Sequence, residues 1–191
     1  MSLDDVLAAI DDANHHDPNL LDGEPLARKQ GQLATAWLAK LAPEASPELQ
    51  LVVRAHHLRR WELARSDFDD GRDGYLRWRR ENKAHQANAL ASIMEDHQQS
   101  PQSIERVRTL LARTKLRSDA ETQTLEDAAC LVFLETQFEP MVERLEHAHM
   151  VDVVAKTLKK MSAVAIALAG SIDLGPASQA VLADAAVQLS K

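Results

Sequence analysis

The sequence is poor in cysteine and in aromatic residues, with one cysteine and an aromatic fraction of 4%. Because Cys130 is the single cysteine, the chain can form no intrachain disulfide and no zinc site built mainly from cysteines. No run of about eighteen apolar residues is present, so we expect no membrane-spanning helix. Asp4 and Asp5 lie where a secretory signal peptide carries basic residues. We therefore expect a cytoplasmic protein.

The sequence also contains few glycines and prolines, and it lacks the alternating pattern of β-strands. Six glycines and seven prolines in 191 residues leave no long flexible linker, and the length favours one domain spanning residues 1–191. No alternation of apolar and polar residues is long enough to predict a sheet. Apolar residues recur instead at three- and four-residue steps. This spacing predicts an all-α fold, a compact orthogonal bundle of about seven to nine helices.

Serine–proline pairs and a serine near the N-terminus mark several helix starts, because a serine hydroxyl caps the first turn and proline suits the position after it. The residues Leu63–Gly74, with their FDDGRDG turn, are expected to form a loop. The expected helices cover Ser2–Ala13, Pro25–Leu41, Pro47–Glu62, Tyr75–His97, a stretch from Pro101, Asp119–Phe138, a stretch ending at Gly170, and a stretch from Pro176.

The charge is acidic overall but locally basic. A formal net charge of −7 argues against a surface that coats nucleic acid. Between Arg54 and Lys83, however, the sequence contains nine basic residues and six acidic residues. This imbalance favours a small anionic ligand, such as a phosphate, over a long polyanion. A solvated, ion-paired surface is the alternative.

The segment Leu49–Glu62 ends in two histidines, two arginines, a tryptophan and a glutamate. Imidazoles bind metals or move protons, and guanidinium groups bind anions in a bidentate manner. Adjacent helical residues diverge by about 100°, so His56 and His57 do not easily bind one metal together. We expect His57 to be the ligand. Two packed, hydrogen-bonded core histidines are the alternative.

An aromatic wall is predicted next to this segment. Tyr75, Trp78, Asn82 and His85 follow one stripe of the next expected helix at three- and four-residue steps. Together with Trp61, the two aromatic residues of this stripe are expected to line a pocket. A stripe of this kind can equally belong to the core.

The buried acid of the sixth expected helix completes a candidate metal site. Asp127 lies in a segment that is apolar on nearly every side, and a buried carboxylate needs a partner. Histidines and carboxylates from separate helices can converge on one metal. We predict a divalent ion, zinc, manganese, iron or nickel, on His57, His85 and Asp127. Glu62 is the expected catalytic carboxylate, and a phosphate is expected at Arg59, Arg60 and Arg79.

Three motifs carry a resemblance to a known family: RAHHLRRWE at Arg54–Glu62, GRDGYLRWR at Gly71–Arg79 and QTLEDAACLVFLE at Gln123–Glu135. They resemble a bacterial and fungal family without assigned function, number four thousand two hundred and two in the domain-of-unknown-function series. The likeness extends from Ile10–Asn19 to Lys156–Ser162. This resemblance implies no activity.

A weaker resemblance is to the helical HD phosphohydrolases, and it implies an HD-domain-like fold. His57 lies where their paired histidine would be, Asp127 where their distant aspartate would be, and His85 matches an additional histidine of some members. Leu58 replaces the paired aspartate, and Gln32 stands where the first histidine would be. These two departures weaken the usual metal site.

Two functions follow as hypotheses. The first is an HD-like, metal-dependent hydrolase that acts on a small phosphate-bearing substrate. The second is a non-catalytic helical binding or regulatory module that recognises an anionic ligand through its arginine cluster. A partner-binding helical protein with an exposed apolar patch is a third possibility. The sequence predicts no oligomeric state.

Overall fold

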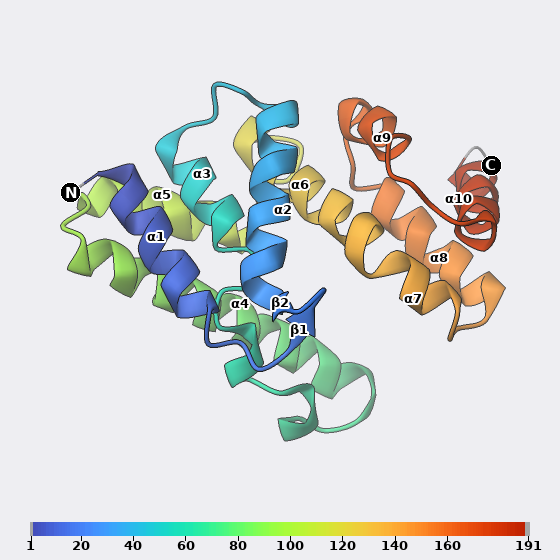
Figure 1. Cartoon of the computed structure of the whole chain (residues 1–191), viewed down its shortest axis with the longest axis horizontal. Helices are drawn as coiled ribbons and strands as arrows, with labels where there is room; N and C mark the ends of the chain where they lie inside the picture. The colour runs from blue at the N-terminus through green and yellow to red at the C-terminus, as the bar shows by residue number, and fades with distance from the viewer. Residues whose placement is uncertain (1, 190–191) are drawn as a thin grey trace.

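The computed structural model describes residues 2–189, and this part of the chain is almost entirely helical (Figure 1). The predicted all-α class is confirmed, although the described helices are more numerous than expected. One pair of two-residue strands is the exception. The elements are α1 (Leu3–Asn14), β1 (Leu20–Leu21), β2 (Glu24–Pro25), α2 (Leu26–Leu41), α3 (Pro47–Arg54), η1 (Arg60–Glu62), η2 (Arg65–Asp67), α4 (Gly71–Asp96), α5 (Pro101–Ala112), α6 (Ala120–Thr136), α7 (Phe138–Val142), α8 (His147–Leu158), α9 (Ala163–Ala169) and α10 (Pro176–Leu189).

The predicted helix starts are confirmed where serine caps were expected. The Ser2 hydroxyl accepts from the Asp5 amide, and the Asp5 side chain accepts from the Ser2 amide, which is a capping box. Ser46 and Ser100 cap α3 and α5 in front of a proline. These local contacts satisfy amide groups that have no partner inside a helix.

Helix α6 is the central helix, as its apolar sequence predicted. It packs against α2, α3, α5, α7 and α9, and Figure 1 shows it running from behind α2 toward α7. Leu125, Leu131 and Leu134 on α6 are fully buried. The buried apolar cluster is continuous from Val6 in α1 to Ala185 in α10. Burying each such side chain contributes about 1.5 to 3 kcal/mol.

The third helix is shorter than predicted, and this correction matters for the site. The helix expected over Pro47–Glu62 ends at Arg54. The chain then turns through two left-handed residues, His57 (φ 62°) and Arg59 (φ 52°), before the short 3-10 helix η1. Gln86 of α4 donates to the Ala55 carbonyl at 2.6 Å, and the following Leu58 is fully buried. Contacts with a distant helix therefore end α3.

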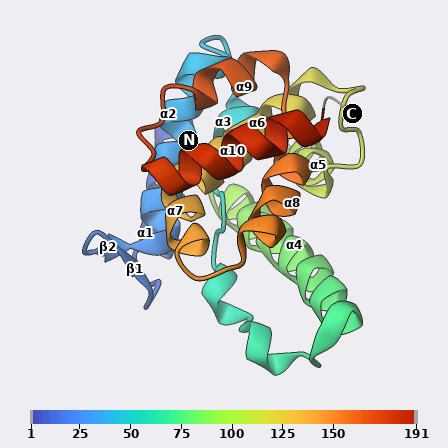
Figure 2. The same ribbon diagram turned by 90° about the vertical axis from the view of Figure 1, so that its right-hand side faces the viewer.

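Helix α4 begins earlier than predicted and reaches beyond the other helices at its N-terminal end (Figure 2). The predicted loop included residues 71–74, but these form the first turn of α4. Gly74 lies so close to the Asp69 carbonyl oxygen that an added Cβ would be 1.8 Å from it. The approach of the preceding chain to α4 therefore requires glycine here.

Two further differences concern the segment before α2 and the helices after α7. Leu20–Leu21 pairs with Glu24–Pro25 across Asp22 and Gly23, both of which have positive φ. This small hairpin was not expected. The predicted helix ending at Gly170 is divided into α8 and α9, with Ser162 capping α9. None of the described helices combines the length and hydrophobicity needed to cross a bilayer.

Candidate anion-binding site

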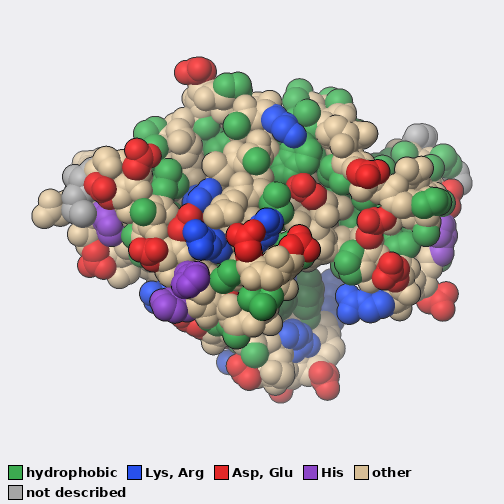
Figure 3. Space-filling view, viewed as in Figure 1, with side chains coloured by type: hydrophobic (Ala, Val, Ile, Leu, Met, Phe, Trp, Pro, Cys, Tyr) green, Lys and Arg blue, Asp and Glu red, His purple; other side chains and the backbone are tan. Residues whose placement is uncertain are grey.

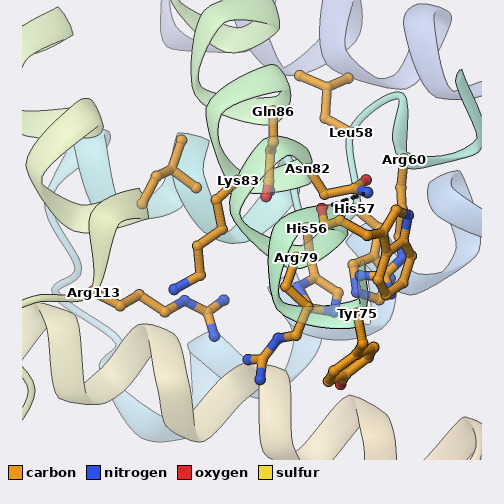
Figure 4. Close-up of a pocket in the computed structure, with 12 residues that line it drawn as sticks. His56, His57, Leu58, Arg60, Tyr75, Arg79, Asn82, Lys83, Gln86 and Arg113 are labelled. Carbon is orange, nitrogen blue, oxygen red and sulfur yellow. Dashed lines mark hydrogen bonds between the residues drawn. The ribbon is translucent and has the colours of Figure 1, made fainter. Parts of the chain in front are cut away.

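A cavity of about 190 Å³ lies between the turn after α3, one face of α4 and the end of α5 (Figure 4). The turn contributes two histidines and an arginine, and α4 contributes residues spaced three or four apart on one face. The lining residues are His56, His57, Leu58, Arg60, Tyr75, Trp78, Arg79, Asn82, Lys83, Gln86, Leu111 and Arg113. Four of them are cations, and none is a carboxylate.

The cations of this cavity are poorly neutralised by the protein. Among the described residues, Arg113 is the only one of the four with a salt bridge; it pairs with Glu126 of α6, and Glu126 is shared with Lys160 at 3.5 Å. Within residues 2–189, no carboxylate forms a salt bridge with Arg60, Arg79 or Lys83. Figure 4 shows the charged ends of Arg79, Lys83 and Arg113 directed toward one region beside the two histidines.

Aromatic rings support two of the guanidinium groups. The Arg60 guanidinium carbon lies 4.7 Å from the centroid of the Trp78 ring, and that of Arg79 lies 5.7 Å from the Tyr75 ring. Such cation–π contacts hold a cation in place without neutralising its charge. The guanidinium groups remain able to bind an anion.

Burial and neighbouring charges both act on Lys83. Desolvation is the main cause that lowers the pKa of Lys83, the charges of Arg113 and Arg79 lower it further, and the charge of Glu126 opposes them. An anion in the cavity would oppose this repulsion and raise the pKa of Lys83. The protein therefore holds its cations in an arrangement that an anion stabilises.

The two histidines are stacked and uncharged. Their ring centroids lie 3.9 Å apart with an interplanar angle of 27°. Burial, followed by the charges of Arg113 and Arg60, lowers the pKa of His56 to about 3. Burial also lowers the pKa of His57 well below 6.5. At neutral pH both imidazoles therefore act as hydrogen-bonding groups and not as cations.

His57 is oriented from the α2 side. Its Nδ1 lies 2.7 Å from Oε1 of Gln30, and Nε2 of Gln30 donates to the Thr136 hydroxyl at 3.3 Å. With this amide orientation Nδ1–H of His57 is the donor, so Nε2 is left as an acceptor. The left-handed backbone of His57 is the kind of strain that is concentrated at binding sites.

Asn82 supplies an unsatisfied polar group in the cavity wall. The residue is 8% exposed, and its Nδ2 donates to the Trp78 carbonyl at 3.3 Å. Its Oδ1 is buried and has no hydrogen-bond partner in the described part of the protein. A buried acceptor without a partner is costly, so this oxygen favours a ligand or water that donates a hydrogen bond.

The predicted metal ligands are not brought together. His57 contacts Gln30, whereas His85 Nε2 lies 2.9 Å from Glu62 Oε2. Asp127 accepts from the Ser162 amide at 2.8 Å and from the Gln123 side chain at 3.0 Å, so it holds α9 against α6. Among residues 2–189 no group of three or more His, Cys, Asp or Glu side chains could hold a metal ion. The three predicted ligands therefore do not fit one metal site.

The predicted anion-binding and aromatic residues are partly assembled. Arg60 and Arg79, with Tyr75 and Trp78, line the cavity. Arg59 does not, because its left-handed backbone directs it to a salt bridge with Glu62 at 3.8 Å. Trp61 lines a neighbouring pocket. Sequence reasoning did not assign His56, Asn82, Lys83, Gln86 and Arg113 to the site.

The neighbouring pocket is larger, at about 500 Å³, and shares His57, Arg60 and Trp78 with the cationic cavity. Its other lining residues come from the hairpin region, the first turn of α2, the η1 region and the end of α6. They are Asp17, Pro18, Asn19, Leu26, Ala27, Gln30, Trp61, Leu63, Ala64, Arg65 and Gln137.

Comparison with known proteins gives one family. The family model described as Domain of unknown function (DUF4202) matches residues 4–182. No curated protein and no solved structure matches the chain. The match covers every residue of the cationic cavity.

Proposed function

The chain belongs to the DUF4202 family, and we propose that it binds a small phosphate-bearing anion in the cationic cavity as a non-catalytic binding or regulatory module. The observation that carries this proposal is the charge of the cavity wall. Four cations line it, no carboxylate lines it, and Arg60, Arg79 and Lys83 have no salt bridge in the described chain. An anion is the missing counter-charge.

A phosphate group suits both the size and the donors of the cavity. A volume of about 190 Å³ admits a small anion but not a folded polymer. Guanidinium groups donate two parallel hydrogen bonds to phosphate oxygens, and a lysine adds a point charge. The unpaired Asn82 oxygen can accept from a hydroxyl or from a protonated phosphate oxygen.

A long nucleic acid is a poorer ligand for this protein. The net charge is −7, and Figure 3 shows basic and acidic side chains interspersed on the visible face. Nucleic-acid-coating proteins present a continuous basic surface. The concentration of cations in one cavity therefore favours a discrete ligand.

Hydrolysis of a phosphate ester is the second candidate function, and one contact favours it. Glu62 Oε2 and His85 Nε2 lie 2.9 Å apart, and a carboxylate–imidazole pair of this kind can act as a general base. Neither residue lines the cationic cavity. The metal-dependent form has no assembled ligand set among the residues that the structure describes, because His57, His85 and Asp127 make separate contacts. Binding without catalysis is thus the better supported function.

Thermal unfolding in matched salts tests the proposal. Sodium phosphate should raise the melting temperature above that in sodium chloride of equal ionic strength, because a ligand that binds only the folded state stabilises it. Equal melting temperatures across phosphate concentrations up to tens of millimolar would refute binding.

A further inference from the structure

We infer that the ligand is a mononucleotide, with its phosphate in the cationic cavity and its base in the neighbouring pocket. This inference rests on the proposed function and adds the chemical class of the ligand. The two cavities share His57, Arg60 and Trp78 as lining residues. A group bound to the cations is therefore adjacent to the larger pocket.

Size separates the roles of the two cavities. The cationic cavity of about 190 Å³ has room for an anionic group and little else. The second pocket, at about 500 Å³, lies in the range of sites for small organic molecules. An organic part attached to the phosphate would thus occupy the second pocket.

Trp61 gives that organic part a flat partner. The three tryptophans of the chain differ in their contacts. Trp37 has Lys40 over its ring and donates from its indole nitrogen to Glu135, while Trp78 has Arg60 over its ring and donates to the Leu63 carbonyl. Half-buried Trp61 makes no ring contact and no side-chain hydrogen bond within residues 2–189. Its indole is free to stack on a planar ring.

The remaining wall favours a base over a sugar or a lipid chain. Leu26, Ala27, Leu63 and Ala64 are apolar lining residues of the second pocket. A lone sugar presents many hydroxyl groups, and these side chains offer them no hydrogen bonds. A lipid chain attached to the phosphate has no planar face to stack on Trp61 and no polar edge to form hydrogen bonds. A nucleobase is flat, mostly apolar on its faces and polar at its edge.

Few polar side chains of the second pocket are free to form hydrogen bonds with the polar edge of a base. Asp17 is occupied, because its carboxylate accepts from the Asn19 amide, the Asn19 side chain and the Ala27 amide. The side-chain amide of Gln137 has no hydrogen bond in the described chain. It both donates and accepts, which suits the mixed edge of a base.

Calorimetric titration of the full chain tests the ligand class. The probes are inorganic phosphate, ribose 5-phosphate, adenosine 5′-monophosphate, cytidine 5′-monophosphate and adenosine. We expect at least one mononucleotide to bind about tenfold more tightly than ribose 5-phosphate, because stacking on an aromatic side chain has an effect of this size. Adenosine should bind more weakly than its monophosphate.

Two variants locate the base. Trp61→Ala should lower mononucleotide affinity about tenfold and leave ribose 5-phosphate binding unchanged. Phe68→Leu is the control, since Phe68 is an aromatic residue of the same region that lines neither pocket. Circular dichroism checks that both variants fold. If Trp61→Ala does not fold, Trp61→Leu replaces it, because leucine keeps an apolar side chain and removes the aromatic face.

The outcomes separate the two proposals. Equal affinity for ribose 5-phosphate and both mononucleotides would overturn the base pocket while leaving phosphate binding intact. A tenfold preference that persists in Trp61→Ala, or in Trp61→Leu where Trp61→Ala does not fold, would also overturn the assignment to Trp61. Absence of binding by every phosphate compound would overturn both the proposed function and this inference.

Discussion

The guanidinium group of Arg60 lies over the indole of Trp78, 4.7 Å from the ring centroid, and both side chains line two adjacent cavities. Arg60 follows the unexpected left-handed turn at His57 and Arg59, while Trp78 lies on α4. This contact joins the turn to the helix that carries Arg79, Lys83 and Asn82. It thereby gives the cationic cavity a defined wall.

Within residues 2–189, Glu126 is the one carboxylate that pairs with a cavity cation, so removing its charge should strengthen anion binding. Burial acts to raise the pKa of Glu126, but Arg113 and Lys160 outweigh it and the net pKa is lowered. Glu126→Gln should therefore increase phosphate affinity. It should also lower the free energy of unfolding at pH 7 by about 1 to 3 kcal/mol, because a charge-assisted hydrogen bond is lost. Calorimetry and urea unfolding measure the two effects, and unchanged affinity would argue that Arg113 does not contact the anion.

The stacked histidines predict a loss of stability in mild acid. The folded-state pKa of His56 is about 3, against 6.5 for the free imidazole. Between these values the unfolded chain binds a proton that the folded chain does not, so stability is full above pH 6.5 and falls as the pH decreases. The expected slope is about 1.4 kcal/mol per pH unit for each imidazole.

Urea midpoints from pH 7 to pH 4.5 measure this slope. The variant His56→Gln removes one of the two imidazoles and should reduce the slope by about half. A wild-type midpoint that stays constant down to pH 4.5 would contradict the lowered pKa values.

The sequence could predict the helices and the buried position of α6, but not the end of α3. Serine caps and apolar spacing are local signals, and they located most helix starts. The turn after α3 depends instead on Gln86, which donates to Ala55 from 31 residues away, and on Asn14, which accepts from the Arg59 amide. Periodicity in one segment contains no information about such distant donors and acceptors.

The same limit explains which site residues were missed. Lys83 and Gln86 continue the spacing of Tyr75, Trp78 and Asn82 along α4, so the stripe itself could have indicated them. Arg113 lies at the basic end of α5, where favourable interaction with the helix dipole is sufficient reason for a cation. Only the packing of α5 beside α4 shows that Arg113 reaches the cavity.

Asp127 is predicted to stabilise the fold without contributing to ligand binding. Its carboxylate accepts from the Ser162 amide and the Gln123 side chain where α9 begins. Asp127→Ala should lower the free energy of unfolding by about 1 to 3 kcal/mol, since two partly buried donors lose their acceptor. Phosphate affinity at a temperature where the variant is folded should be unchanged. A loss of bound metal or of ligand affinity in this variant would instead assign Asp127 to a site.

The separate contacts of His57, His85 and Asp127 predict no stoichiometric metal in the purified protein. Elemental analysis after dialysis should find much less than one divalent ion per chain, and a chelator should leave the melting temperature unchanged. One bound ion per chain that is lost in His57→Ala would contradict this expectation. It would restore the metal-dependent hydrolase as the leading function.

The most direct measurement is phosphate titration of two matched double variants on α4. Arg79→Gln with Lys83→Gln removes two cavity charges, whereas Arg77→Gln with Arg80→Gln removes two charges from residues outside the cavity lining. We predict that the first pair lowers phosphate affinity at least tenfold, because one charge-assisted hydrogen bond contributes about 1.5 to 3 kcal/mol. The second pair should change affinity less than twofold at 150 mM salt, where exposed charges are screened over about 8 Å. Equal losses in both variants, or no loss in the first, would contradict an anion site in this cavity.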